Sequence, residues 1–306
     1  MAYIMETNGL TKIYGSKAAA EDINIHIREG EIYGLIGRNG AGKTTIMRMI
    51  SGLSNPTRGE YMLFGKSGNE MRKMLKKVGV LIEHPGLYPR FSARDNLKIK
   101  CIGMGVDYKS GYIDELLKIV GLESVSDKKA AGEFSLGMRQ RLGIALALVG
   151  DPSMIILDEP INGLDPQGIV EVRHTLEKLR DEKGITIMVS SHILAELGKI
   201  ADSYGIIHEG KLIDQFTTTE LEEKCSQYIT VKTNDNLKAV DIISGIGISG
   251  TKTDDEGNIR VYDTLDKSPV IAKAIVNAGL ELHDLHSTNV SLEDYYLSVT
   301  GGADNA

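Results

Sequence analysis

The clearest chemical signal is a glycine-rich stretch that fits the pattern G-x-x-x-x-G-K-T at residues 37–44. It lies between an expected strand at 32–36 and an expected helix at 43–50, the context in which this pattern binds phosphate. Glycines allow successive backbone N–H groups to face one centre, and a helix that begins there adds its positive dipole end. An incidental lysine in a glycine-rich turn is the alternative, but the complete pattern in this context favours a phosphate cradle.

Within this cradle, Lys43 can reach the β- and γ-phosphates of a nucleotide. The hydroxyl of Thr44 is a suitable ligand for Mg²⁺, which prefers oxygen. The residues expected to contact the nucleotide are Gly37, Arg38, Asn39, Gly40, Ala41, Gly42, Lys43, Thr44 and Thr45.

Two adjacent carboxylates, Asp158 and Glu159, follow a mostly apolar run at 153–157. In a parallel sheet, the carboxyl end of such a strand opens onto the ligand crevice. Asp158 is then placed to hold Mg²⁺, and Glu159 could polarise an attacking water. The alternative is an acidic turn after a core strand, and the phosphate cradle earlier in the chain makes the chemical interpretation the stronger one.

A histidine, His192, follows another apolar run at 185–189. At the carboxyl end of a strand it would face the same crevice, where it could contact the γ-phosphate or the water. An isolated histidine is more often an ordinary surface or core residue. Its position after a second strand of the same sheet favours a functional role.

These side chains require a scaffold in which short apolar strands alternate with helices. Runs that are apolar on both faces, separated by helical patterns, predict a parallel sheet with helical crossovers. A helix is expected at 166–183 because Asp165 occupies an N-cap position and Pro166 the first turn. Strands are also expected at 78–82, 153–157 and 185–189, a further helix at 135–149, and a hairpin-like stretch at 205–211.

Length and charge restrict the possible classes of protein. The chain has 306 residues and a formal net charge of −7, with 25% charged residues. This acidic balance argues against non-specific nucleic-acid binding, which needs a basic surface. The sequence offers neither an apolar stretch of about 18 residues nor a signal-peptide pattern. Cys101 and Cys225 are far apart and are expected to be free thiols.

A second, smaller domain is expected at 223–306, after a first domain at 1–222. Its pattern is compatible with a split β-α-β arrangement of ferredoxin type. Beyond a short helix at 220–224, the expected strands are 228–232, 259–262 and 280–285, the helices are 237–244, 268–278 and 291–298, and a turn is expected at 254–258.

Several motifs in the first domain resemble those of one family. Residues 134–140, Phe-Ser-Leu-Gly-Met-Arg-Gln, resemble the ABC signature, and residues 162–165, Asn-Gly-Leu-Asp, resemble the D-loop. His192 resembles the switch histidine, and Tyr14 the aromatic that stacks on adenine. With the phosphate cradle and the acid pair they occur in the family order across residues 3–222. The chain therefore resembles the nucleotide-binding subunit of an ABC transporter.

The resemblance implies a P-loop NTPase of ABC type: a mostly parallel sheet, a helical subdomain at about 88–150 and an antiparallel β part. It implies a homodimer, or a heterodimer with a related ATPase, that sandwiches two ATP molecules with Mg²⁺. Asp158 and Thr44 would hold the metal, and Glu159 and His192 would be catalytic. The further nucleotide contacts would be Tyr14, Glu83, Ser135, Leu136, Gly137 and Asp165.

Three positions depart from the commoner family pattern. Leu136 replaces a glycine in the signature, Glu83 stands where the Q-loop glutamine is expected, and Ile161 replaces a small hydroxyl residue. A carboxylate at position 83 could contact Mg²⁺ or water, but it would repel the γ-phosphate unless the metal screens it. The motifs that contain these three positions together resemble those of the branch that serves bacitracin and lantibiotic export or self-protection.

The leading hypothesis is an ATPase subunit that powers a separate membrane permease and is attached through it to the inner face of the cell membrane. The permease is expected to dock near residues 83–94, where Arg90 and Arg94 would support coupling. A mechanical ATPase acting on ribosomes or DNA is the alternative. Such ATPases usually carry a long basic or coiled-coil insertion, and this sequence shows no such insertion. A small-molecule kinase would leave the signature and D-loop unexplained.

Overall fold

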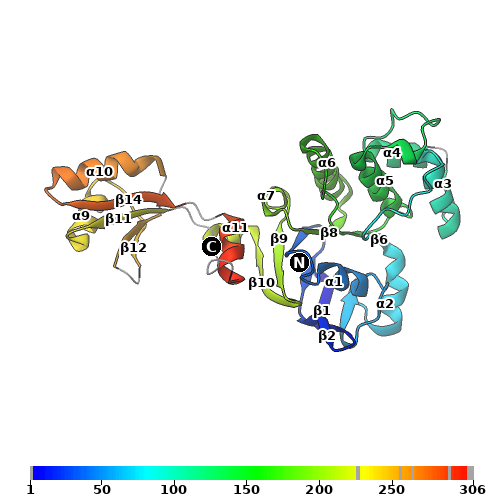
Figure 1. Ribbon diagram of the computed structural model, residues 1–306, viewed down its shortest axis with the longest axis horizontal. Helices are drawn as coiled ribbons and strands as arrows, with labels where there is room; N and C mark the ends of the chain where they lie inside the picture. Colours follow the sequence, from blue (N-terminus) through cyan, green and yellow to red (C-terminus); the bar gives the residue numbers. More distant parts are fainter. Residues whose placement is uncertain are drawn as a thin grey trace. The chain divides into compact units, whose positions relative to one another are not determined.

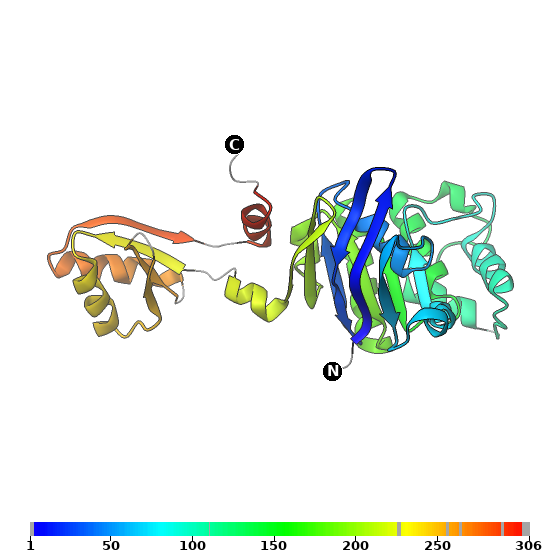
Figure 2. The same ribbon diagram turned by 90° about the horizontal axis from the view of Figure 1, so that it is seen from below.

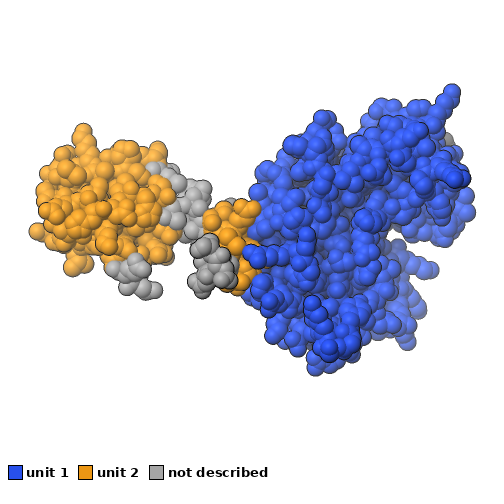
Figure 3. Space-filling view, in the orientation of Figure 1, with its two compact units in different colours: residues 1–218 blue, residues 219–306 orange. Residues whose placement is uncertain are grey.

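The computed structural model describes residues 3–109, 111–224, 228–254, 257–262, 265–288 and 291–301. The chain forms two compact units, residues 1–218 and 219–306, which are coloured separately in Figure 3. This division and the boundary expected after residue 222 both fall in helix α8 (Thr218–Lys224). Cys101 is a buried free thiol, whereas Cys225 and part of the turn expected at 254–258 lie outside the described residues.

A mostly parallel sheet forms the centre of the first unit (Figure 1). Strand β4 and strands β6 to β9 pair in parallel, and only β10 pairs antiparallel with its neighbour β9. Every residue of β4, β7 and β8 is buried, which explains the short apolar runs that these strands contain. The predicted parallel sheet is thus confirmed. Its order is β10 (Lys211–Thr217), β9 (Ser203–His208), β4 (Ile32–Ile36), β8 (Thr186–Ser191), β7 (Met154–Leu157) and β6 (Val78–Leu81).

A second sheet of the first unit is antiparallel. Its long strand β1 (Tyr3–Tyr14) pairs with β2 (Lys17–Ile23), β3 (His26–Arg28) and β5 (Arg58–Leu63), and Figure 2 shows these strands in blue. Apolar residues of this sheet share one core with helix α1 (Lys43–Ile50) and with β4 and β7. The antiparallel part that the family resemblance implied is therefore present, and it helps to fix the helix that follows the glycine-rich stretch.

The helices that carry the expected motifs begin and end close to their predicted positions. Helix α1 has the predicted bounds, as does α6 (Pro166–Lys183), whose N-cap is Asp165. Helix α5 spans Leu136–Leu148 and is capped by the Ser135 hydroxyl. Two glycines allow α5 to lie directly on the β6 region: a Cβ on Gly79 would be 2.0 Å from the Ala147 carbonyl oxygen, and one on Gly143 would be 2.7 Å from Pro85 Cβ.

A helical part follows β6 in the chain, where the family resemblance implied a helical subdomain. It contains α3 (Ala93–Met104), α4 (Tyr112–Ile119) and α5. Within the described part of the chain, none of the helices combines the length and apolar character needed to cross a membrane. Shorter elements of the first unit are α2 (Gly68–Met74), η1 (Leu75–Lys77), η2 (Ala131–Glu133) and α7 (Leu194–Leu197).

The second unit contains an antiparallel sheet in the order β12-β13-β11-β14. The chain order β11, α9, β12, β13, α10, β14 gives the predicted ferredoxin-type arrangement. Ile229 and Val231 of the sheet form a core with residues of both helices, including Ile243 and Ile271. The elements are β11 (Tyr228–Thr233), α9 (Asn236–Gly245), β12 (Thr251–Thr253), β13 (Ile259–Val261), η3 (Leu265–Lys267), α10 (Ser268–Asn277), β14 (Leu282–Thr288) and α11 (Leu292–Val299).

Candidate nucleotide site

The glycine-rich stretch forms a tight loop between β4 and α1. Gly40 and Gly42 have positive φ angles of 83° and 109°, which glycine adopts most easily. Gly37 and Gly42 also lack space for a side chain, because a Cβ would lie 2.6 Å from the Ile207 carbonyl oxygen and 2.4 Å from the Ala19 carbonyl oxygen, respectively. The glycines are therefore required by both backbone geometry and packing, and they leave the start of α1 accessible.

A pocket of about 570 Å³ opens beside this loop. Lys43 and Thr44 line it from α1, and Glu159 lines it from the segment after β7. Glu209 and Gly210 contribute from the turn between β9 and β10. The pocket thus combines a helix N-terminus with a lysine and a hydroxyl, which is the donor set that binds phosphate. The other lining residues are Lys17, Ala18, Ala19, Asn39, Gly40, Gly42 and Thr45.

The first carboxylate, Asp158, is buried and fully engaged. Its Oδ2 accepts a 2.7 Å hydrogen bond from Thr44 Oγ1, and its Oδ1 accepts a 2.6 Å bond from Ser190 Oγ. Ser190 Oγ in turn accepts the backbone N–H of Glu159 at 2.9 Å. The two residues predicted to hold a metal are therefore in direct contact. Ser190 on β8, which the sequence analysis did not single out, orients both acidic positions.

The second carboxylate, Glu159, connects the lysine to the histidine. Its Oε1 lies 3.0 Å from Lys43 Nζ, and its Oε2 lies 2.8 Å from His192 Nδ1. Glu159 has a positive φ of 49°, so the chain turns sharply after the buried strand. Lys43 also donates to the carbonyl oxygens of Gly37 at 2.6 Å and Arg38 at 3.3 Å. The predicted cradle, acid pair and histidine thus converge at one place.

The Q-loop position is occupied by Glu83, which has a positive φ of 65°. Its Oε1 accepts a 2.8 Å bond from Arg48 Nη2 on α1, and both side chains are exposed. Arg48 was not expected from the sequence to take part. Because α1 begins at the phosphate loop, this ion pair joins the Q-loop position to the same helix that carries Lys43 and Thr44.

The remaining predicted contacts lie outside the pocket lining. Ser135 caps α5 by accepting the Met138 N–H at 3.2 Å, and Asp165 caps α6 by accepting the Gly168 N–H at 3.2 Å. Leu136 is 39% exposed and lies against Gly163, and the Tyr14 ring is exposed beneath the Lys12 ammonium at 5.1 Å. Across the described residues, the pocket lining includes none of Tyr14, Glu83, Ser135, Leu136, Gly137 and Asp165.

Comparison with known proteins establishes the family. Residues 20–162 match the ABC transporter domain. The chain is 42% identical over 304 residues to the bacitracin transport ATP-binding protein BcrA of Bacillus licheniformis, which covers 99% of both chains. The chain belongs to the ATP-binding subunits of ABC transporters. The resemblance found in the sequence is thereby confirmed.

Other relatives of this ABC subunit agree in sequence and in fold. The lantibiotic transport ATP-binding protein SrtF of Streptococcus pyogenes is 45% identical over 210 residues, which is 69% of this chain and 89% of that protein. The solved structure of the cassette MJ0796, a dimer bound to ADP and Pi, is 26% identical with a TM-score of 0.63. It covers 70% of this chain and 98% of that chain. The ABC subunit is therefore an ATPase with the P-loop NTPase fold of its family.

Proposed function

We propose that the pocket beside the phosphate loop binds ATP with Mg²⁺ and hydrolyses the nucleotide. The observation that carries this proposal is the direct contact between the start of α1 and the end of β7. Lys43 reaches Glu159, and Thr44 reaches Asp158, so groups that bind phosphate and groups that activate water share one pocket.

The residues fit a magnesium ion. Thr44 Oγ1 and Asp158 Oδ2 are hard oxygen ligands only 2.7 Å apart. A protein site for Mg²⁺ in this class of fold needs few side chains, since phosphate and water oxygens complete the coordination. When bound, the ion would neutralise charge on the phosphates. Ser190 would keep the Asp158 carboxylate oriented toward it.

For hydrolysis, Glu159 is the proposed general base. It would accept a proton from water while the water oxygen bonds to the γ-phosphorus and the bond to the β–γ bridging oxygen breaks, leaving ADP and phosphate. The bond from His192 Nδ1 would hold the carboxylate in place. Lys43 now pairs with Glu159, so incoming phosphate oxygens would compete for its ammonium and release the base for water.

Two substitutions test this assignment. Lys43→Ala should abolish measurable ATP binding, whereas Glu159→Gln should retain binding but slow turnover on the order of 10²- to 10⁴-fold. Nucleotide binding is measured by calorimetry and turnover by phosphate release. Glu182→Gln, at an exposed position near the end of α6, is the control for loss of a carboxylate. Normal turnover in both site variants would contradict the proposed mechanism.

We also propose that two ATP-binding subunits sandwich the nucleotides head to tail, as a homodimer or with a related ATPase. Ser135, Leu136 and Gly137 lie at the start of a 13-residue helix, α5, yet they are absent from the pocket lining. A helix N-terminus binds anions, so this one is suited to the γ-phosphate of the opposite subunit. Asp165, Glu83 and the exposed Tyr14 would add contacts when the nucleotide is bound. The dimeric state of MJ0796 supports this arrangement.

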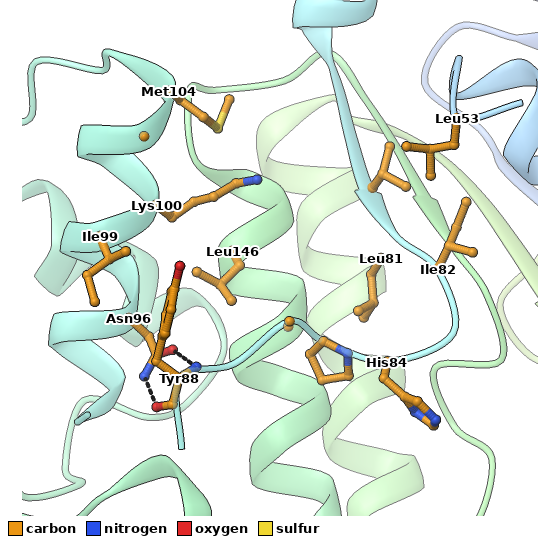
Figure 4. A pocket seen from close by; sticks show the side chains of 15 residues that line it. Leu53, Leu81, Ile82, His84, Tyr88, Asn96, Ile99, Lys100, Met104 and Leu146 are labelled. Atoms are coloured by element: carbon orange, nitrogen blue, oxygen red, sulfur yellow. Dashed lines mark hydrogen bonds between the residues drawn. The ribbon is translucent and has the colours of Figure 1, made fainter. Parts of the chain in front are cut away.

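A groove of about 600 Å³ is the proposed docking site for a membrane permease. Figure 4 shows that apolar side chains line it from β6, α3 and α5, among them Leu81, Ile99 and Leu146. Asn96 fixes the Tyr88 segment by accepting the Tyr88 N–H at 2.8 Å and donating to its carbonyl at 3.2 Å. The groove begins directly beside Glu83, so an inserted permease segment would be close to the nucleotide site.

The docking proposal is tested by filling the groove. Gly103 on α3 lines the groove and has open space around its Cβ position, so Gly103→Trp should obstruct it without backbone strain. The neighbouring residue Ile102 is 71% exposed and does not line the groove, which makes Ile102→Trp the matched control. Only the first variant should lose co-purification with the permease while it retains ATPase activity. Equal co-purification of the two variants would place the docking site elsewhere.

The relatives support a role in export of, or self-protection against, an antimicrobial peptide or another drug-like substrate. BcrA, which is named for bacitracin transport, is 42% identical to this chain. SrtF, which is named for lantibiotic transport, is 45% identical over the part that matches. In this proposal residues 1–222 form the nucleotide-binding domain, with a helical subdomain at about 88–150, and residues 223–306 form an accessory domain. The subunit would work at the inner face of the cell membrane, attached through its permease and without nucleic acid.

A further inference from the structure

In the second unit, helices α9 and α10 both pack on one face of the sheet, and we call the opposite face the open face. Ile229 and Val231 of β11 point into the core with α9 and α10. Because side chains alternate along a strand, Tyr228, Thr230 and Lys232 point to the opposite face. The cross-strand register extends this open face over all four strands of the sheet.

One cross-strand row of the open face is cationic. Thr230 is paired with Arg260 on one side and with His286 on the other, and Arg260 is paired with Lys252. Three basic side chains from three strands therefore lie in a line. Two tyrosines flank this row: the Tyr228 and Tyr262 rings are 5.6 Å apart, and the Arg260 guanidinium lies 4.8 Å from the Tyr228 ring centroid.

The next row carries carboxylates. Asp284 on β14 is paired with Lys232, and Asp254 follows β12 at the other edge. Each carboxylate also contacts the cationic row, since Asp284 Oδ2 is 3.1 Å from His286 Nδ1 and Asp254 Oδ2 is 3.3 Å from Arg260 Nε. This row also contains Lys232, and its exposed carboxylate is Asp284, which is 50% exposed against 10% for Asp254. A polyanion would meet the Asp284 carboxylate, which disfavours it as the ligand of this face.

We propose that the open face binds the same face of a second copy of this chain. A two-fold axis parallel to the rows, between the cationic row and the carboxylate row, brings each row of one copy over the opposite row of the other. Such an isologous contact is self-complementary, as two-fold symmetry requires. The tyrosines supply apolar surface at its edge. Asp284 and His286, both about half exposed, form a hydrogen-bonded pair on the edge strand β14 and are the exposed polar pair of this contact.

The contact acts as a clamp that supplements the ATP-dependent dimer, so it rests on the proposed function. The face is formed by short strands and is small compared with a stable interface, so the contact is weak alone. Once ATP holds two nucleotide-binding domains together, the second contact becomes intramolecular and gains from a high effective concentration. It slows dissociation of the dimer on the order of 10-fold.

The test uses the full chain with Glu159→Gln, which should accumulate the ATP-bound dimer. Dissociation after removal of ATP is followed by light scattering. Asp284→Lys and His286→Glu should each accelerate dissociation about 10-fold, and the double variant, in which the charges are exchanged, should restore the slow rate. Lys252→Glu tests the opposite edge. Lys273→Glu, which is exposed on α10, is the control for the same charge change on the covered side.

The outcomes separate the clamp from the proposed function. If the Glu159→Gln protein does not dimerise with ATP, the proposed ATP sandwich fails, whatever the second unit does. If it dimerises but all variants dissociate at the control rate, the clamp is overturned. Loss of permease binding with an unchanged dissociation rate would also overturn it, because the face would then belong to the permease. Circular dichroism of each variant verifies that the second unit remains folded.

Discussion

At the scale of single residues, Ser190 links the two carboxylates of the nucleotide site. It is completely buried on β8, donates to Asp158 and accepts the Glu159 N–H. A hydroxyl in an apolar strand has no distinctive sequence pattern. Only the parallel pairing of β7 with β8 brings Ser190 next to Asp158. Its proposed role is therefore one of positioning.

Ser190→Ala should weaken metal binding more than nucleotide binding. Removal of the hydroxyl deletes a hydrogen bond to a charged group, which is worth about 1.5–3 kcal/mol. The Mg²⁺ concentration for half-maximal ATPase activity should rise about 10-fold, measured by magnesium titration at saturating ATP. Ser191→Ala is the matched control, because that buried hydroxyl exchanges hydrogen bonds with the backbone of Ile193 and not with the carboxylates of the site. Equal magnesium requirements in the two variants would exclude the positioning role.

Single site residues could be predicted from the sequence, whereas contacts between distant side chains could not. Lys43, Thr44, Asp158, Glu159 and His192 were predicted because each follows a strand or starts a helix that local patterns identify. Pairing between distant side chains leaves no such pattern. The bond between Arg48 and Glu83 spans 35 residues and depends on the left-handed conformation at Glu83. Glu83 was expected to contact Mg²⁺ or water at the nucleotide site, and its ion pair with Arg48 was not predicted.

At the scale of elements, the contact of α5 with β6 places the signature helix against the central sheet. Gly79→Ala should break this contact, since the new Cβ would lie 2.0 Å from the Ala147 carbonyl oxygen, which is backbone and cannot rotate away. Overpacking of this kind costs about 1–3 kcal/mol. Urea unfolding should show that the free energy of unfolding is lower by about this amount. Gly103→Ala, where no atom lies within 4 Å, should have no comparable effect.

Contacts within the helical part give Arg94 a structural role, while its expected part in coupling to the permease stays a prediction. Arg94 Nη2 bonds to Asp114 on α4 at 2.6 Å, and Nε bonds to Asp127 at 3.0 Å. The hydrogen bond with Asp114 is the main cause that raises the pKa of the guanidinium, and Asp127 adds to it. Arg94 thus connects α3 to α4 and to the Asp127 segment within the helical part. Arg90, by contrast, is exposed.

Arg94→Glu should therefore loosen the helical part instead of acting on permease docking alone. The new carboxylate would face two others and repel them, which should lower the thermal midpoint and increase proteolysis between α3 and α5. Arg90→Glu provides the comparison, with an unchanged midpoint. If the Arg94→Glu protein is as stable as the unsubstituted chain, the structural role is wrong and docking remains the role expected for Arg94.

Elements themselves were predicted where caps or buried runs define them. The bounds of α6 follow from Asp165 and Pro166, and those of α1 follow from the glycine loop. Strand β12, only three residues long, was not predicted because its sequence Thr-Lys-Thr is polar and its pairing with β13 is what makes it a strand. Strand β8 extends two residues beyond its expected end, through Ser190 and Ser191, since neighbouring strands bury these polar residues.

At the scale of the whole molecule, the two units have separate hydrophobic cores. The first is built around β1, α1 and β4, and the second around β11, α9 and α10. Residues that contact the proposed nucleotide all lie in the first unit. The ligand should therefore raise the stability of the first unit and leave the stability of the second unit unchanged. The two units can then be distinguished by their unfolding in solution.

Calorimetric unfolding should accordingly contain two transitions, and only one should respond to MgATP. A ligand at 100 times its dissociation constant stabilises the state that binds it by about 2.7 kcal/mol. With Glu159→Gln to prevent turnover, MgATP should raise the midpoint of the transition that belongs to residues 1–218. Ile243→Ala, in the core of the second unit, should lower only the other midpoint. A single transition that shifts as a whole in both experiments would mean that the two cores unfold as one cooperative unit.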